Sequence, residues 1–197
     1  MKLPGGGALV GGPAMDEEEL LVLARRGDNA ARTELVMRHG GRLFGLAAAL
    51  LGGSDADVND MVQETFLAAF DGGLKAFKGN ASLATWLSGV LINRVRKLRR
   101  YRRSRPAGPL DAFERQPAAG DSASRGPATQ AQQRIDAATM LDSLPPDYRE
   151  VIVLREWQQM SYAEMASVLG VPERTAETRL TRARRMLRQR FGGYEPV

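Results

Sequence analysis

The chain has 197 residues, 43% of them apolar, with a formal net charge of +5 and a sequence pI of about 10.0. This length suits one large domain or two small ones with ordinary buried cores. The absence of cysteine excludes disulfides, thiolate metal sites, a cysteine nucleophile and a thiol redox switch within the chain. The basic balance favours an anionic partner, either a nucleic acid or an anionic membrane surface.

The first 15 residues are rich in glycine and contain no apolar run long enough for the core of a signal peptide. No later stretch approaches the roughly 20 apolar residues that a membrane span requires. We therefore predict a disordered N-terminus over residues 1–15 and a soluble, cytoplasmic protein.

Residues 16–105 show helical periodicity almost throughout and predict a first domain. Asp16 is a candidate N-cap for a helix that has three glutamates in its first turn and ends near Gly27. A second helix is expected from Asp28 to the pair Gly52-Gly53. Its predicted core residues are Leu35, Leu43, Leu46, Leu50 and Leu51.

A third helix, capped by Ser54, carries two different stripes. Its predicted buried face comprises Val58, Met61, Val62, Thr65, Phe66, Ala69 and Phe70. The other stripe is polar and acidic and comprises Asp57, Asp60, Gln63, Glu64 and Leu67. Such a stripe is most often a solvated helix face, but its charge would repel nucleic acid, so it should meet either protein or water.

Ser82 is the expected cap of a long fourth helix, which follows a short polar loop over residues 77–81. The end of this helix is strongly basic, with seven arginines and one lysine between Arg94 and Arg105. These positive side chains repel one another unless an anion binds near them. Trp86 is suited to stack on an unpaired base, although a core role is the commoner one for a tryptophan. Asn80 alone would indicate only a turn. Together these features suggest a surface for single-stranded nucleic acid.

Residues 106–129 have little periodicity and many Pro, Ala, Gly, Ser and Asp residues, which predicts a flexible linker. A coil of this length has a typical end-to-end distance of roughly 25–30 Å and extends to about 80 Å. The two flanking domains would then be able to occupy separate sites on one large partner.

Residues 130–192 predict a second helical domain. A first helix ends at Pro145-Pro146, and the next is expected to bury Val151, Ile152, Leu154 and Trp157. The run from Ser161 to Glu164 is a capping box, and Gly170 is the expected C-cap of the short helix that it starts. A final helix then reaches Phe191, so this domain has the outline of a helix-turn-helix.

The final helix separates an apolar side from a basic one. On a helical wheel Ala176, Leu180, Ala183, Leu187 and Phe191 share the side that we expect to be buried. Arg174, Thr178, Arg182 and Arg185 lie opposite, with Thr175 close by. Arginine and threonine on an exposed helix suit the edges of bases and the phosphates of a DNA major groove, whereas the common alternative is a solvated basic face.

Several segments, in this order, resemble the extracytoplasmic-function (ECF) sigma factors, group 4 of the bacterial sigma-70 family. Residues 57–67 (DVNDMVQETFL) resemble the helix that binds RNA polymerase, and residues 77–87 (FKGNASLATWL) resemble the promoter-melting stretch. Residues 144–151 (LPPDYREV), 161–166 (SYAEMA) and 179–184 (RLTRAR) resemble the second sigma domain. The likeness extends from Asp16 to Phe191 except for the linker.

This resemblance implies a non-enzymatic, all-α protein with a region 2 bundle and a region 4 helix-turn-helix, which acts without a cofactor, a catalytic residue or a metal. Its partners would be core RNA polymerase, promoter DNA and an anti-sigma factor. The implied polymerase contacts are Asp57, Asp60, Gln63, Glu64 and Leu67. The implied contacts to the -10 element are Lys78, Asn80, Ser82, Trp86, Asn93, Arg94 and Lys97, and those to the -35 element are Arg174, Thr175, Thr178, Arg179 and Arg182.

Residues 174–179 (RTAETR) depart from the family's usual Gly-Thr-Val-Lys-Ser-Arg, because Glu177 replaces a lysine. Glu177 would be repelled by phosphate unless it pairs with Arg174 or accepts a hydrogen bond from a cytosine amino group. The sequence therefore does not predict which -35 bases the final helix would recognise.

Two other functions compete with this interpretation. A helix-turn-helix regulator that is not a polymerase subunit would leave the acidic stripe and the loop at residues 77–81 unexplained. An enzyme is disfavoured because the sequence offers no obvious catalytic partner for the only histidine, His39. We expect His39 to be a surface or half-buried helix residue.

Overall fold

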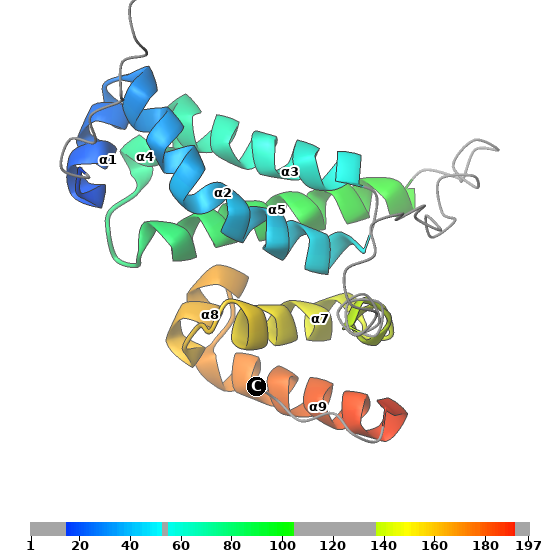
Figure 1. The fold of residues 1–197 in the computed structure, drawn as a ribbon. Helices are drawn as coiled ribbons and strands as arrows, with labels where there is room; N and C mark the ends of the chain where they lie inside the picture. Colours follow the sequence, from blue (N-terminus) through cyan, green and yellow to red (C-terminus); the bar gives the residue numbers. More distant parts are fainter. Residues whose placement is uncertain (1–14, 53–54, 105–136, 192–197) are drawn as a thin grey trace, which may run out of the picture.

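The computed structural model describes residues 15–52, 55–104 and 137–191, and within these ranges the chain is helical with no strand (Figure 1). The predicted all-α class is confirmed. The N-terminal segment, the Ser54 cap and the linker that we predict at residues 106–129 lie outside the described residues. Within the described ranges, no helix combines the length and the apolar character that a membrane span needs.

The first half of the fold is a helical bundle (Figure 1). It comprises α1 (Glu17–Arg25), α2 (Asn29–Leu51), α3 (Asp55–Ala68), the π-helical turn η1 (Ala69–Gly73), α4 (Leu74–Ala76) and α5 (Leu83–Ser104). The predicted start and stop signals act as expected. Asp16 accepts a hydrogen bond from the backbone N–H of Glu19 at 2.7 Å, and Gly52 ends α2 in the left-handed conformation with φ 58°.

The pair Gly72-Gly73 forms the corner between α3 and α4. Gly72 has φ 93°, which favours glycine, and a Cβ atom on Gly73 would lie 2.5 Å from the carbonyl oxygen of Ala68. This tight corner lets the short helix α4 follow α3 directly. The chain then enters the 77–81 loop, which leads to α5.

The second half contains a helical stretch at residues 137–142, α7 (Pro146–Ile152), the π-helical turn η2 (Val153–Trp157), α8 (Tyr162–Leu169) and α9 (Glu173–Phe191). The capping box of Ser161 and Glu164 is present, and Gly170 caps α8 with φ 67°. The tight turn between α8 and α9 gives the predicted helix-turn-helix.

Three predictions about burial are wrong, and three further residues that we predict to be buried, Leu51, Val62 and Phe70, are only partly buried. Trp157 is 49% exposed, because the wider η2 turn shifts the last residue away from the side that Val151 and Leu154 bury. Phe191 is 37% exposed, because it is the last residue of α9. His39 is buried instead of half-buried, and its Nε2 atom lies 3.0 Å from a carboxylate oxygen of Glu17.

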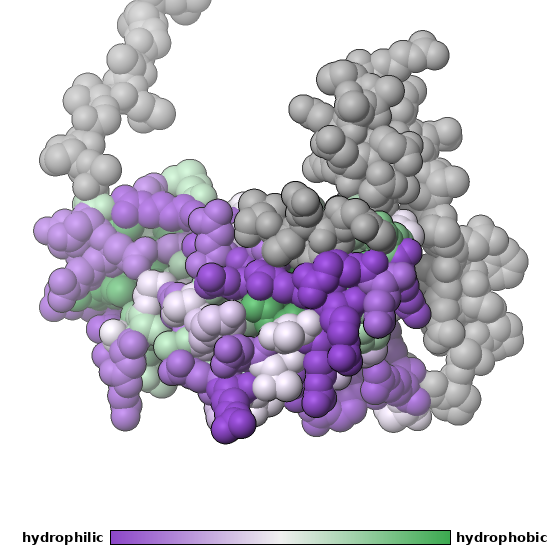
Figure 2. Space-filling view, turned by 90° about the horizontal axis from the view of Figure 1, so that it is seen from below, coloured by the Kyte–Doolittle hydropathy of each residue, from purple (hydrophilic) through white to green (hydrophobic). Residues whose placement is uncertain are grey.

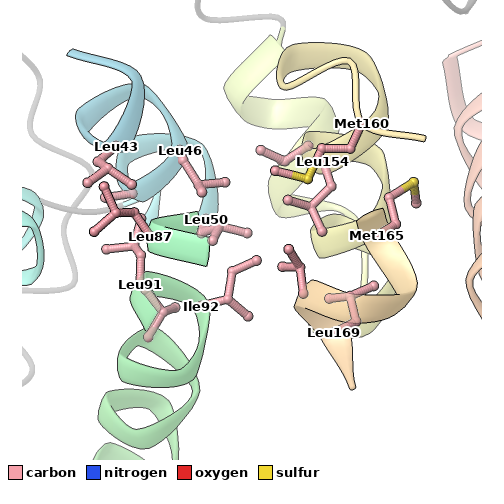
Figure 3. Close-up of a cluster of buried hydrophobic side chains, with 14 of the residues drawn as sticks. Leu43, Leu46, Leu50, Leu87, Leu91, Ile92, Leu154, Met160, Met165 and Leu169 are labelled. Atoms are coloured by element: carbon pink, nitrogen blue, oxygen red, sulfur yellow. The ribbon is translucent and has the colours of Figure 1, made fainter. Parts of the chain in front are cut away.

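The two halves pack against each other. The helix α5 lies on α8, and α2 lies on η2 and α7. Buried apolar side chains face one another from both halves: Leu46, Leu50 and Ile92 from the bundle, Leu154, Met160 and Leu169 from the helix-turn-helix side (Figure 3). All of these are at most 4% exposed, so the interface is a continuation of the core. Nothing in the sequence pattern indicated this contact.

Candidate nucleic-acid interface

The acidic stripe lies on the outer face of α3. Asp60, Gln63, Glu64 and Leu67 are exposed, Leu67 at 66%, whereas Asp57 is partly buried. Two of its carboxylates accept hydrogen bonds from α5: Glu64 from Arg94 and Asp57 from Arg102, each at 2.8 Å. Carboxylates of α3 therefore neutralise part of the basic cluster on α5. The exposed apolar side chain of Leu67 and the amide of Gln63 remain available to a partner.

The 77–81 loop and the first half of α5 enclose a pocket of about 360 Å³. Its wall includes Lys78, Asn80, Trp86 and Asn93. The Trp86 ring is half-buried and lies 5.4 Å from the ring of Phe77, centroid to centroid. Trp86 therefore packs on the core with one part of its ring and lines the pocket with another.

The remaining residues predicted for this surface lie beside the pocket and not in its wall. Ser82 is exposed and its hydroxyl accepts a hydrogen bond from the N–H of Thr85 at 3.1 Å, so it caps α5 as predicted. Arg94 turns to Glu64, and Lys97 is exposed one turn further along α5.

The helix α8 closes one side of this pocket. Ser167 and Val168 belong to its wall, and a Cβ atom built on Gly89 of α5 would lie 3.9 Å from the Cα atom of Val168. The hydroxyl of Thr85 also donates a hydrogen bond to Glu164 at 3.0 Å. In this arrangement the second domain therefore forms one wall of the pocket, while Lys78, Asn80 and Asn93 stay exposed.

Glu164 combines this contact with its role in the capping box. Hydrogen bonds from the backbone and hydroxyl of Ser161, with a smaller contribution from Thr85, lower the pKa of Glu164. A lowered carboxyl pKa in the folded state means that the cap stabilises the fold at pH values above the ordinary pKa of glutamate. That stabilisation is lost as the pH falls through the lowered value.

A buried carboxylate, Glu150 of α7, joins the two halves. It is 1% exposed and accepts hydrogen bonds from Arg96 of α5 at 2.6–3.2 Å, while Arg99 lies 3.7 Å away. The hydrogen bonds to Glu150 raise the pKa of Arg96. Desolvation, with the positive charges of Arg149, Arg103 and Arg96, lowers the pKa of Arg99. Arginine stays charged at these shifts, so Glu150 is a single buried negative charge shared by two arginines of α5.

The sequence interpretation missed Glu150, Thr85, Ser167 and Val168. The only signal for Glu150 was its place directly before the apolar run Val151–Leu154, since a carboxylate beside buried residues needs a cationic partner. That signal does not say which arginine the partner is.

The face of α9 that we predict for duplex DNA is exposed at Arg174, Thr178 and Arg182, and partly buried at Thr175 and Arg179. Arg179 makes an ion pair with Asp147 at 2.9 Å, and the hydroxyl of Thr178 donates to the carbonyl oxygen of Arg174 at 2.7 Å. Glu177 is exposed. The side of the molecule on which α9 lies is predominantly hydrophilic (Figure 2).

All five predicted -35 contacts line a cleft of about 1000 Å³ between α9 and α5. The basic end of α5 forms the facing wall, so the predicted -35 surface is turned toward the boundary between the two halves. In the part of the chain that the structure describes, no group of three or more histidine, aspartate or glutamate side chains is placed to hold a metal ion.

Comparison with known proteins matches both halves to families. Residues 35–105 match sigma-70 region 2, and residues 134–187 match sigma-70 region 4. The RNA polymerase sigma factor NccH of Alcaligenes xylosoxydans xylosoxydans is 35% identical over 181 residues, which cover 89% of this chain and 94% of NccH. The ECF RNA polymerase sigma-E factor of Escherichia coli K12 is 28% identical over 86% of this chain and 91% of that protein.

A solved structure, that of CnrH in complex with the cytosolic domain of CnrY, superposes with a TM-score of 0.67 at 29% identity. The match covers 91% of this chain and 99% of CnrH. Both sigma-70 regions therefore occur in this chain, in the same order and over most of its length, and the second contains the helix-turn-helix found in the structure. The chain belongs to the sigma-70 family and is an RNA polymerase sigma factor of the ECF type.

Proposed function

We propose that residues 16–105 bind core RNA polymerase and open the -10 element, and that residues 130–192 read the -35 element as duplex DNA. The polymerase contacts would be Asp57, Asp60, Gln63, Glu64 and Leu67. The -10 contacts would be Lys78, Asn80, Ser82, Trp86, Asn93, Arg94 and Lys97, and the -35 contacts Arg174, Thr175, Thr178, Arg179 and Arg182. The chain would act in the cytoplasm as a non-enzymatic subunit, with residues 106–129 as the tether between its domains.

The observation that carries this proposal is the pocket beneath the 77–81 loop. Its wall combines the aromatic ring of Trp86, the amides of Asn80 and Asn93 and the ammonium group of Lys78, which suit the π-face, the polar edge and the phosphate of one flipped nucleotide. Extrusion of a base costs a few kcal/mol, which these contacts and phosphate contacts from Arg94 and Lys97 would offset. Strand opening would then be driven by binding, without ATP.

Reconstitution with sigma-free core polymerase tests the proposal. The full chain, mixed with core polymerase and a promoter library, is expected to direct initiation at a defined set of sequences, read by sequencing the transcripts. Stable binding to duplex operators without any specific initiation would instead indicate a helix-turn-helix regulator that is not a polymerase subunit.

Charge reversal at Glu64 is expected to weaken polymerase binding. The Glu64→Lys variant places a cation in the acidic stripe at a position that is exposed in the structure, where its pair with Arg94 contributes little to stability. We expect the affinity for core polymerase, measured by fluorescence anisotropy, to fall at least about tenfold, as for a charged contact at an interface. Duplex binding by the second domain should be unchanged.

The matched control is Glu18→Lys, which reverses an exposed carboxylate on α1, outside the stripe. It should bind polymerase as the unaltered chain does. Equal losses in Glu64→Lys and Glu18→Lys, or a parallel loss of duplex binding in Glu64→Lys, would contradict the assignment of the stripe.

Removal of the Arg182 side chain is expected to weaken -35 binding. If Arg182 reads a base edge, Arg182→Ala should cost about 1–3 kcal/mol and relax the sequence preference at one position. If Arg182 touches only phosphate, the loss of affinity is smaller. The slope of log affinity against log salt concentration then falls by about one unit in magnitude. Titration of duplex DNA at several salt concentrations separates these results, and Arg188→Ala, an exposed arginine further along α9, is the control. A loss no greater than that of Arg188→Ala would remove Arg182 from the interface.

The similarity to CnrH, whose solved structure contains the cytosolic domain of CnrY, also supports an anti-sigma partner for this chain. Co-expression with candidate inhibitors, followed by purification of the complex, is the direct test.

A further inference from the structure

The cleft between α5 and α9 gathers an unusual density of positive charge. Arg96, Arg99, Arg100 and Arg103 line it from α5, and Arg174, Arg179 and Arg182 line it from α9. Two carboxylates face them, Asp147 and Glu150, both from α7. Seven guanidinium groups against two carboxylates leave a strong excess of positive charge between two protein walls.

Both carboxylates are already used. Asp147 pairs with Arg179 at 2.9 Å, and Glu150 with Arg96 at 2.6 Å and Arg99 at 3.7 Å. Within the described residues, Arg100, Arg103, Arg174 and Arg182 have no carboxylate partner in reach of an ion pair. These four cations stand on opposite walls, so closing the two halves brings like charges together unless an anion lies between them.

We propose that this cleft is a binding site for a compact polyphosphate anion, which bridges the α5 wall and the α9 wall. Guanidinium groups bind phosphoryl oxygens in a bidentate manner, and a chain of phosphoryl groups places several negative charges within a small volume. A cleft of about 1000 Å³ is at the upper end of the size of small-ligand sites. An acidic peptide carries its charges further apart, and a duplex needs the α9 face free of the facing α5 wall.

Because the ligand touches both walls, it binds the closed arrangement and not one in which the halves have separated. By mass action it stabilises that arrangement, and by reciprocity promoter DNA and the anion oppose each other. The predicted opposition between promoter DNA and the anion rests on the proposed -35 role of α9. The binding of the polyphosphate to the cleft does not depend on that role.

The direct test is calorimetric titration of the full chain with sodium tripolyphosphate at constant ionic strength, without DNA or polymerase. Two variants each remove two charges from one wall: Arg100→Gln with Arg103→Gln, and Arg174→Gln with Arg182→Gln. Each is expected to lose at least about tenfold in affinity, as for charge-assisted hydrogen bonds. The control variant, Lys97→Gln with Arg188→Gln, removes the same charge outside the cleft and should change the affinity less than about twofold.

Two further variants test the bridge between the halves. Gly89→Gln places a side chain against α8, near Val168 and outside the cleft, and should weaken tripolyphosphate binding by holding the halves apart. It also favours the helical state of α5, so misfolding is not the expected cause of a loss. A chain locked closed by a disulfide between Cys substitutions at Gly89 and Val168 should bind at least as tightly as the unaltered chain.

A parallel titration with ATP identifies the source of the anion. Equal affinity with the same dependence on both walls supports a nucleoside-linked polyphosphate, and binding of tripolyphosphate alone supports the inorganic one. Equal losses in the wall and control variants would mean unspecific attraction and overturn the site, as would binding that is unaffected by Gly89→Gln. Failure of the proposed function is distinguishable, because it would appear as absent initiation while the tripolyphosphate titration is unchanged.

Discussion

A disulfide between Gly89→Cys and Val168→Cys is expected to abolish promoter opening. The Cβ position of residue 89 lies 3.9 Å from the Cα atom of Val168, so the two Cα atoms are closer than the roughly 6.8 Å upper limit for a disulfide. The bond would hold Ser167 and Val168 of α8 in the wall of the pocket that Trp86 and Asn80 line, and we expect this fixed wall to hinder the entry of a flipped base. Initiation by the oxidised chain with core polymerase should fall to background, and a reductant should restore it.

The chain contains no cysteine, so this pair introduces the only thiols and cannot exchange with others. The reduced double variant is the matched control, because it carries the same substitutions without the bond. Transcript yield and permanganate reactivity of the -10 strand measure opening, and a non-reducing gel measures the bond. Undiminished opening by the fully oxidised chain would show that α8 does not block the pocket.

Neutralising Glu150 is expected to shift the chain from the closed arrangement to an open one. Glu150→Gln keeps the shape of the side chain but leaves Arg96 and Arg99 facing each other without their shared counter-charge, while the charge of Arg149 adds to the repulsion on Arg99. Removal of one partner from a buried pair costs about 3–5 kcal/mol, and the partly exposed arginines reduce this to about 2 kcal/mol. The ratio of closed to open chains should then fall by roughly 30-fold, since 1.4 kcal/mol is about tenfold.

Energy transfer between dyes reports this shift. Cysteine substitutions at the exposed residues Ala56 on α3 and Gln189 on α9 place one dye on each half. The control is Glu156→Gln, which breaks the pair between Glu156 and Arg184 at 2.7 Å, a buried carboxylate and arginine of the same domain. It should lower the melting temperature without changing energy transfer. If Glu150→Gln also leaves energy transfer unchanged, Glu150 does not hold the halves together.

Much of the local structure follows from the sequence because it depends on neighbours along the chain. The cap at Asp16, the capping box at Ser161 and the left-handed end at Gly170 each involve atoms within a few residues, and each is found where it was predicted. The apolar stripe of α9 also gives its buried side, with Ala176, Leu180, Ala183 and Leu187 at 1% exposure or less. The π-helical turn η2 departs from the spacing of a regular α-helix. The helical pattern therefore predicted a buried Trp157, which is exposed in the structure.

The order of the acidic stripe, the polar loop and the helix-turn-helix was sufficient to identify the family from the sequence by itself, because each motif is local. Only the tertiary structure decided that α8 contributes to the wall of the loop pocket, that Glu150 pairs with Arg96 and Arg99, and that the arginines of α5 and α9 share a cleft. These contacts join residues that are more than 50 positions apart. Their apolar components, such as Ile92 and Leu169, have the same pattern as any core residue, so no spacing rule reveals which surface they meet.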